Sequence, residues 1–284
     1  MMCAGIIAKH TDPRAESIVS ELCNWLEGAG RKVVLDRETA SLVGRADAVV
    51  RSQLPDHCDF LIVIGGDGTL LSAARVVGTS GKPILGVNLG SLGFMTAVTL
   101  DELYPALDRI FRSDIDFDER MMLVAHVHRL GERVANYTVL NDVVINKGAL
   151  AKIIDIKTTV GDTYLSTFKA DGLIISTPTG STGYSLAAQG PIVYPTLHSI
   201  LITPICPHML TFRPLMVPDS MVVRAELASK ETDVFLTLDG QVGFGLREGD
   251  VIEVRKAHST LRFIRSPFRD YFTVLRTKLK WGER

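Results

Sequence analysis

The segment FLIVIGGDGTLLSAARVV, residues Phe60–Val77, decides how the first part of the chain folds. Its first five residues are all apolar, which predicts a parallel strand that is buried on both faces. Glycines then end the strand, and apolar residues recur at helical spacing over Leu70–Val77. A strand, a glycine turn and a helix in this order are typical of one unit of an α/β fold.

The same alternation of strand and helix runs through residues 1–117. Strands are predicted at Ala4–Ala8, Val33–Leu35 and Ile84–Val87, and further helices after Asp12 and at Leu100–Phe111. Asp12 is predicted to cap the first helix, with Pro13 at the first helical position. Asp36 ends the second strand, but because no Gly-x-Gly-x-x-Gly motif accompanies it, we interpret it as a solvated turn residue. We therefore expect a doubly wound, Rossmann-like α/β domain over residues 1–117.

From residue 118 the pattern becomes that of a β protein. The predicted strands are Leu123–Val127, Tyr137–Leu140, Ile153–Val160, Leu173–Ser176, Val222–Leu227, Val234–Leu238 and Val251–Val254. Turn residues separate them, which predicts a mainly antiparallel β domain over residues 118–266. Residues 267–284 contain a predicted helix, Tyr271–Leu279, and we expect this tail to pack back on the first domain.

Composition narrows the classes of function. The 284 residues include 31 Lys and Arg against 32 Asp and Glu, for a net charge of −1. A surface that binds nucleic acid or an acidic membrane normally needs a basic excess, so we expect neither partner. The four cysteines form no C-x-x-C pair, which favours a reducing compartment. No apolar run is as long as a membrane span, and Met1–Ala8 lacks the basic start of a signal peptide, so we expect a cytoplasmic protein.

The loop Gly65-Gly66-Asp67-Gly68-Thr69 is a candidate phosphate site. Its glycines allow backbone amides to approach a ligand, and the start of the following helix adds a positive dipole end. Asp67 is unusual there, because a carboxylate repels phosphate. It either accepts a proton from an attacking hydroxyl or engages Mg²⁺, or it is simply the N-cap of the helix, and the loop alone leaves these alternatives open.

A second segment, STPTGSTGYS at Ser176–Ser185, is rich in small and hydroxyl residues and by itself also fits an ordinary turn and helix cap. The longer string DGLIISTPTGSTGYSLAAQGPIV, Asp171–Val193, resembles the ATP-dependent NAD kinase family. NLGSLGF (Asn88–Phe94), LNDVVI (Leu140–Ile145) and LDGQ (Leu238–Gln241) occur in the family's order. The resemblance covers almost the whole chain.

The resemblance implies that ATP phosphorylates the 2′-hydroxyl of the adenosine ribose of NAD, giving NADP. It implies that Asp67 is the general base and that Gly68 contacts the ligand, beside the phosphate-loop residues Gly65, Gly66 and Thr69. Asn141 and Asp142 match the pair that holds the adenosine. Further ligand-lining positions are Lys152, Lys169, Asp171, Thr182, Gly183, Tyr184, Ser185 and Gln241.

The resemblance also implies Mg²⁺ with ATP and a homo-oligomer, a dimer or tetramer, with no metal ion held by the protein itself. Many relatives have Asn-Glu where this chain has Asn141-Asp142, and Gly183 replaces a common alanine. Lys169 stands at a position that the family links to preference for oxidised over reduced dinucleotide. Two other functions stay open: a kinase with the same loop acting on a lipid or sugar hydroxyl, and a non-catalytic pyridine-nucleotide sensor.

One further pair of residues has metal-ligand chemistry. His126 and His128 alternate on a predicted strand and would face the same side. With no third ligand nearby in the sequence, we interpret them as a polar strand face rather than a metal site.

Overall fold

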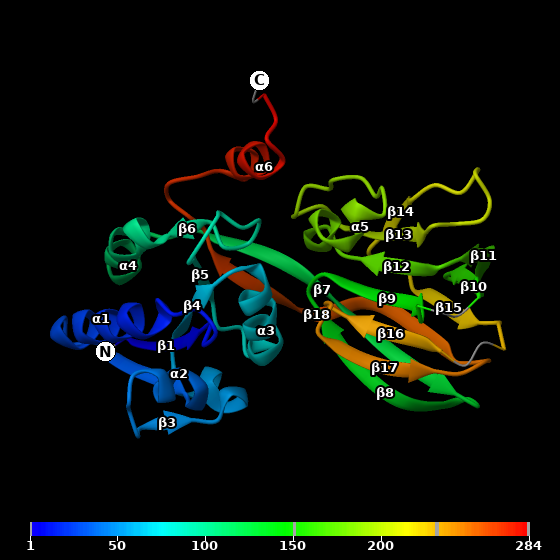
Figure 1. Cartoon of the computed structure of the whole chain (residues 1–284). Helices are drawn as coiled ribbons and strands as arrows, with labels where there is room; N and C mark the ends of the chain where they lie inside the picture. Colours follow the sequence, from blue (N-terminus) through cyan, green and yellow to red (C-terminus); the bar gives the residue numbers. More distant parts are fainter. Residues whose placement is uncertain (1, 150–151, 231–232, 283–284) are drawn as a thin grey trace. The chain divides into compact units, whose positions relative to one another are not determined.

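The computed structural model describes residues 2–149, 152–230 and 233–282. The chain divides into two compact units (Figure 1): Met1–Glu119 together with Leu261–Arg284, and Arg120–Thr260. No helix in the described part of the chain is long and apolar enough to cross a membrane.

The first unit is built on a parallel sheet. Its strands lie in the order β3 (Ala48–Val49), β2 (Lys32–Asp36), β1 (Cys3–Ala8), β4 (Phe60–Gly65) and β5 (Ile84–Asn88). β6 (Val98–Thr99) and the end of β18 (Val251–Ile264) also pair with β5 in parallel. Strand order reverses between β1 and β4, the arrangement in which open α/β sheets bind ligands at the carboxyl ends of the strands.

Helices cover both faces of this sheet, which confirms the doubly wound prediction. The helices of this unit are α1 (Ala15–Gly28), α2 (Arg37–Leu42), α3 (Asp67–Val77), α4 (Leu103–Phe111) and α6 (Tyr271–Leu279), of which α1, α3 and α4 pack on the sheet; the 3-10 helices are η1 (Arg51–His57) and η2 (Leu100–Glu102). Buried residues of α1 and α4 share one core with Ile6, Ile62 and Ile64. On the opposite face, a Cβ added to Gly86 would lie 2.5 Å from Cδ1 of Leu70 in α3, so this helix packs closely there.

Two of the predicted turn residues have other roles. Asp12 does not cap α1, because its carboxylate binds the backbone N–H and guanidinium of Arg14, and the helix begins only at Ala15. These bonds lower the pKa of Asp12 to about 2. Asp36 is fully buried rather than solvated: its side chain accepts a hydrogen bond from Thr39 N at 3.0 Å as the N-cap of α2, and it pairs with Arg51. The prediction that Asp12 caps α1 and the prediction that Asp36 is solvated are therefore both wrong; the helix cap is Asp36, on α2.

The second unit consists of antiparallel strands in two sheets (Figure 1). One sheet contains β11 (Thr163–Ala170), β10 (Ile154–Val160), β15 (Val223–Leu227), β18, β7 (Phe117–Arg129) and β8 (Glu132–Val139). The other has the order β14 (Leu215–Pro218), β13 (Ser199–Ile205), β12 (Gly172–Ser176), β9 (Asp142–Lys147), β16 (Val234–Leu238) and β17 (Val242–Leu246). Their apolar residues form one shared core, as in a β-sandwich. After β12 the chain forms the short turns η3 (Thr179–Thr182) and α5 (Tyr184–Ala187).

Candidate functional site

A pocket of about 360 Å³ opens at the carboxyl ends of β1, β4 and β5 in the first unit. Lys9 follows β1, Gly66 and Asp67 follow β4, and Asn88 and Gly90 come from the end of β5 and beyond. This is the edge where parallel sheets of this order bind their ligands. The helix α3 begins in the pocket wall, so its positive dipole end is available to an anion.

The glycines of the loop serve two different purposes. A Cβ added to Gly65 would lie 2.4 Å from Oγ1 of Thr69, so Gly65 is needed for the loop to pack on its own helix. A Cβ added to Gly66 or Gly68 would meet no atom within 4 Å. These two positions therefore leave room beside the backbone, which suits the close approach of a ligand.

The two kinds of glycine make a matched test. We expect Gly65→Ala to lower the free energy of unfolding by about 1–3 kcal/mol, because a methyl group is forced into a packed site. We expect Gly66→Ala to leave the urea midpoint unchanged but to weaken binding of a phosphate ligand. Equal urea midpoints for the two variants would contradict this division of roles.

The Asp67 carboxylate binds a neighbouring loop instead of capping its own helix. Oδ2 accepts a hydrogen bond from Phe94 N at 2.9 Å, and Oδ1 accepts from Met95 N at 3.2 Å and Thr96 N at 3.1 Å. The hydroxyl of Thr96 also donates to Oδ1 at 3.0 Å. The N-cap position belongs to Gly66, so the N-cap interpretation of Asp67 is wrong.

These hydrogen bonds join the loop Gly65–Thr69 to the segment that begins with the motif Asn88–Phe94. Asn88 donates to the hydroxyl of Thr96 at 2.7 Å and accepts from Gly90 N at 2.7 Å. A Cβ added to Gly93 would lie 2.1 Å from Oδ1 of Asp67, so only glycine allows the loop to approach the carboxylate this closely. Asp67 therefore sets the conformation of residues 90–96 as well as facing the pocket. The motif NLGSLGF contains Asn88 but not Thr96, and the sequence predicts no role for either residue.

The pocket wall is positively charged. In the part of the chain that the structure describes, the pocket is lined by three cations, Lys9, Arg14 and Lys278, and by two carboxylates, Asp12 and Asp67. Asp12 binds Arg14 at 2.9 Å, and Asp67 is held by backbone amides, so neither carboxylate pairs with Lys9 or Lys278 in the pocket wall; the Lys278 ammonium lies 5.9 Å from the centre of the Phe94 ring. Neither lysine was predicted as a site residue: Lys9 follows β1 outside any motif, and Lys278 lies in α6, far away in the sequence.

The second unit holds the Asn141-Asp142 pair at the start of β9. One buried carboxylate, that of Asp239, accepts hydrogen bonds from the backbone N–H groups of Leu140, Asn141 and Asp142 at 2.7–3.1 Å. Asp239 has φ of 50° and Gly240 has φ of 64°, a left-handed pair that turns the chain sharply between β16 and β17. Asp239 was not predicted as a site residue, although the LDGQ motif contains it.

The STPTG turn packs directly on the same pair. Thr177 N donates to the carbonyl of Asn141 at 2.9 Å, and the Thr177 hydroxyl donates to the carbonyl of Leu140 at 2.6 Å. A Cβ added to Gly180 would lie 2.2 Å from the Asn141 carbonyl oxygen, so glycine is required there. The two sequence motifs therefore form one structure around Asn141 and Asp142.

Burial makes the carboxyl group of Asp142 an unusually weak acid. Desolvation, and then the negative charge of Asp239, raise the pKa of Asp142 to about 7. Because the folded pKa lies above the unfolded value, the folded state holds this proton more tightly than the unfolded chain. Asp142 then stabilises the fold at acidic pH, and this contribution is lost as the pH rises from about 4 through about 7.

We expect the wild type to show this loss of stability and Asp142→Asn, whose amide cannot ionise, not to show it. The difference in free energy of unfolding between wild type and the variant should shift against the wild type between pH 4 and pH 8, by at most on the order of 4 kcal/mol. Urea unfolding at several pH values measures it. A difference that is constant with pH would show that Asp142 does not titrate in this range.

Four predicted ligand-lining residues follow β12; two of them, Gly183 and Tyr184, are exposed, and the other two, Thr182 and Ser185, have hydroxyls that are hydrogen-bonded within the protein. Gly183 is exposed, and a Cβ there would lie 3.7 Å from Nδ2 of Asn141 and 3.9 Å from Oδ2 of Asp142, so it borders the pair. Tyr184 is 46% exposed at the first position of α5. The hydroxyls of Thr182 and Ser185 are engaged within the protein, by the carbonyl of Thr179 at 3.2 Å and the hydroxyl of Thr203 at 3.0 Å.

The remaining predicted residues are Lys152, Lys169, Asp171 and Gln241, which lie at exposed or partly exposed positions. Lys152 and Gln241 are exposed, and the Lys169 ammonium lies 3.8 Å from Oδ1 of Asp155. The Asp171 carboxylate lies 3.7 Å from the ammonium of Lys147. Their roles toward a ligand stay predictions.

Comparison with known proteins decides the family. The model of the ATP-NAD kinase N-terminal domain matches residues 4–115, and that of the C-terminal domain matches residues 140–266. This chain belongs to the ATP-NAD kinase family. Similar members include the NAD kinases of Geobacter sulfurreducens, 56% identical over 279 residues that cover 98% of each chain, and of Solibacter usitatus, 46% identical over 281 residues that cover 99% of this chain and 98% of that one.

Solved structures of the family share its fold. Yeast NADH kinase complexed with NADH has a TM-score of 0.92 and 26% identity, covering 100% of this chain and 89% of that one. An NAD kinase from Archaeoglobus fulgidus in complex with ATP has a TM-score of 0.78 and 23% identity, covering 97% of this chain and 99% of that one, a likeness of fold alone. Family membership confirms the resemblance and disfavours a lipid or sugar kinase.

Proposed function

We propose that this chain is an NAD kinase, which transfers the γ-phosphoryl group of ATP to the 2′-hydroxyl of the adenosine ribose of NAD and releases NADP. The observation that carries the proposal is the cationic pocket at the glycine loop, with a carboxylate at its wall, in a chain of this family. Phosphoryl transfer needs mainly positioning and neutralisation of charge, and such a pocket supplies both.

In this proposal each group of residues has one task. The loop glycines and the start of α3 hold the phosphates of the donor, and Asp67 accepts the proton of the attacking hydroxyl. Each carboxylate oxygen has about two acceptor positions; Oδ1 of Asp67 already receives three donors, whereas among the described residues Oδ2 receives only the N–H of Phe94, so Oδ2 is the oxygen with room for the hydroxyl. Asn141 and Asp142, held by Asp239, bind the adenosine portion, with Gly183 and Tyr184 beside them.

A divalent cation, Mg²⁺, is proposed to enter with ATP. Among the described residues, the carboxylates that line the pocket are those of Asp12 and Asp67, and both are already engaged. The donor set therefore fits a cation that is bound mainly through phosphate oxygens, as Mg²⁺ commonly is, rather than a protein cage. When bound, it would neutralise charge on the phosphates.

A coupled assay tests the proposed function. Purified protein is incubated with NAD, ATP and Mg²⁺, and NADP is measured with an NADP-specific dehydrogenase. We expect NADP to form in proportion to enzyme and time, and Asp67→Asn is the inactive control. A protein that binds NAD but forms no NADP with ATP or polyphosphate would instead be a sensor. Parallel reactions with NADH, in wild type and Lys169→Ala, test whether Lys169 favours the oxidised dinucleotide.

Removing the pocket residue Lys278 is expected to weaken binding of ATP selectively. Lys278→Ala should raise KM for ATP about 10-fold, the effect of removing one charge-assisted hydrogen bond of about 1.5 kcal/mol, and leave KM for NAD nearly unchanged. Lys280→Ala, which removes a cation from the same end of the chain but not from the pocket lining, is the matched control. If both variants behave alike, Lys278 does not bind the donor.

The assembly and the compartment also remain proposals. We propose a homo-oligomer, a dimer or tetramer, that acts in the cytoplasm. Light scattering coupled to size exclusion measures the mass of the assembly.

A further inference from the structure

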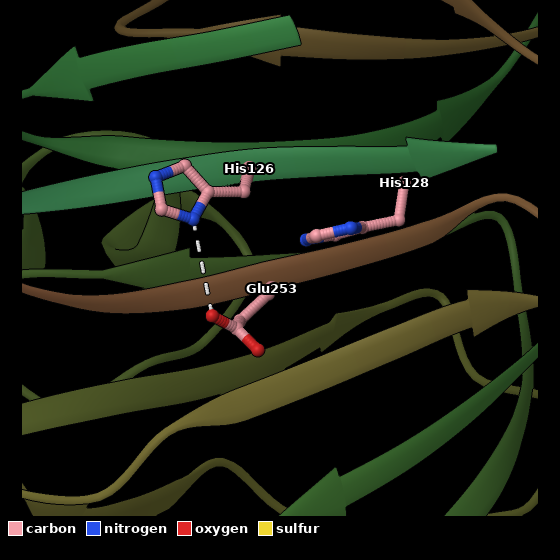
Figure 2. Close-up of side chains that lie close together, drawn as sticks. All are labelled: His126, His128 and Glu253. Carbon is pink, nitrogen blue, oxygen red and sulfur yellow. Dashed lines mark ion pairs between the residues drawn. The ribbon is translucent and has the colours of Figure 1, made fainter. Parts of the chain in front are cut away.

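His126, His128 and Glu253 converge in the second unit (Figure 2). His126 and His128 alternate on β7, and Glu253 comes from β18, the strand that pairs with it. Their ligand atoms all lie within 4.8 Å of one another. The third ligand that sequence reasoning did not find is thus 125 residues away in the chain, on the adjacent strand.

The three groups do not satisfy one another. Nδ1 of His126 lies 3.8 Å from Oε1 of Glu253, too far for a hydrogen bond. Nε2 of His128 is buried and has no hydrogen-bond partner among the described residues. A buried ring nitrogen without a hydrogen-bond partner costs free energy, so this nitrogen is available to bind a ligand.

A simple ion pair does not account for the cluster. Burial, followed by the charges of Arg133 and Arg255, lowers the pKa of His126. A neutral imidazole keeps a lone pair, which is the form that binds a metal. Arg224 donates to Oε2 of Glu253 at 2.9 Å and so orients the carboxylate with Oε1 toward His126. Outer-shell partners of this kind commonly fix metal ligands.

We propose that His126, His128 and Glu253 form a binding site for a divalent transition metal of the Zn²⁺ class. Two imidazoles and one carboxylate suit Zn²⁺, with water as the fourth ligand. Tetrahedral bonds of about 2.1 Å place ligand atoms roughly 3.4 Å apart, so small side-chain rotations close the site. Arg133 and Arg255 are exposed, and solvent screens their repulsion of the cation. The metal would link β7 to β18, and the site shares no residue with the proposed catalytic and ligand-binding residues.

Direct metal binding tests the proposal on the full-length protein after treatment with chelator. Calorimetric titration with Zn²⁺ should give one ion per chain, with a higher melting temperature, whereas Mg²⁺ should give neither. Co²⁺ should give the visible absorption of a low-coordinate nitrogen-oxygen site. His128→Gln and Glu253→Gln should each weaken Zn²⁺ binding at least about 10-fold.

Controls separate this site from adventitious binding. His258→Gln removes an exposed histidine from β18, the strand of Glu253, and this variant should bind Zn²⁺ like the wild type. Circular dichroism and NADP formation should be unchanged in His128→Gln, because this residue is outside the catalytic machinery. Absence of one-to-one binding in wild type, or equal affinity in His128→Gln, Glu253→Gln and wild type, would overturn the proposal, whatever the outcome of the NADP assay.

Discussion

Asp67→Asn is expected to lower kcat for NADP formation by about 10²–10⁴-fold, the usual contribution of a placed general base. An amide cannot accept the ribose proton, although it occupies nearly the same volume. KM for NAD should change little, because the variant alters proton transfer rather than adenosine binding. Steady-state kinetics with the coupled NADP assay measure both parameters.

The hydrogen bonds of Asp67 make a second control necessary. The asparagine would also turn an NH₂ group toward one of the amide donors at Phe94, Met95 or Thr96, which disturbs the loop. Thr96→Val removes one donor to Asp67 but keeps the carboxylate. If Thr96→Val loses as much kcat as Asp67→Asn, Asp67 acts by positioning the loop; if it retains most of its activity, the carboxylate itself is needed.

The largest effect on stability is expected at Asp239→Asn. Its carboxylate satisfies three backbone N–H groups, and an asparagine leaves at least one of them facing an NH₂ group. Loss of a buried, charge-assisted hydrogen bond and the orphaned donor should cost roughly 2–4 kcal/mol of unfolding free energy. The urea midpoint measures this, with Asp162→Asn in an exposed turn as the matched control.

The same variant should affect the adenosine site. Burial is the larger cause of the raised pKa of Asp142 and remains in the variant, but without the negative charge of Asp239 this pKa should fall below about 7. NAD affinity should drop as well, because Asn141 and Asp142 lose the group that orients their backbone. A normal urea midpoint together with normal NAD affinity would show that Asp239 does not hold the pair.

Local patterns predicted many of the elements, because burial and helical spacing are written in consecutive residues. The helix Tyr271–Leu279 and the strand–glycine–helix segment at Phe60–Val77 lie where the sequence placed them. β9, β11, β13, β14 and β17 were not predicted. β9 begins with a polar Asp-containing turn and β17 carries two glycines, so neither shows the usual alternation of a half-buried strand.

The sequence by itself determined the fold class and the family, because these depend on contiguous motifs and local patterns. Only the tertiary structure decided what the key carboxylates bind. The partners of Asp67 lie 27 to 29 residues away, and those of Asp239 lie 97 to 99 residues away. The same holds for Glu253 beside His126 and His128. Strand pairing brings such distant residues together, and no local periodicity records which amide or imidazole a buried carboxylate will meet.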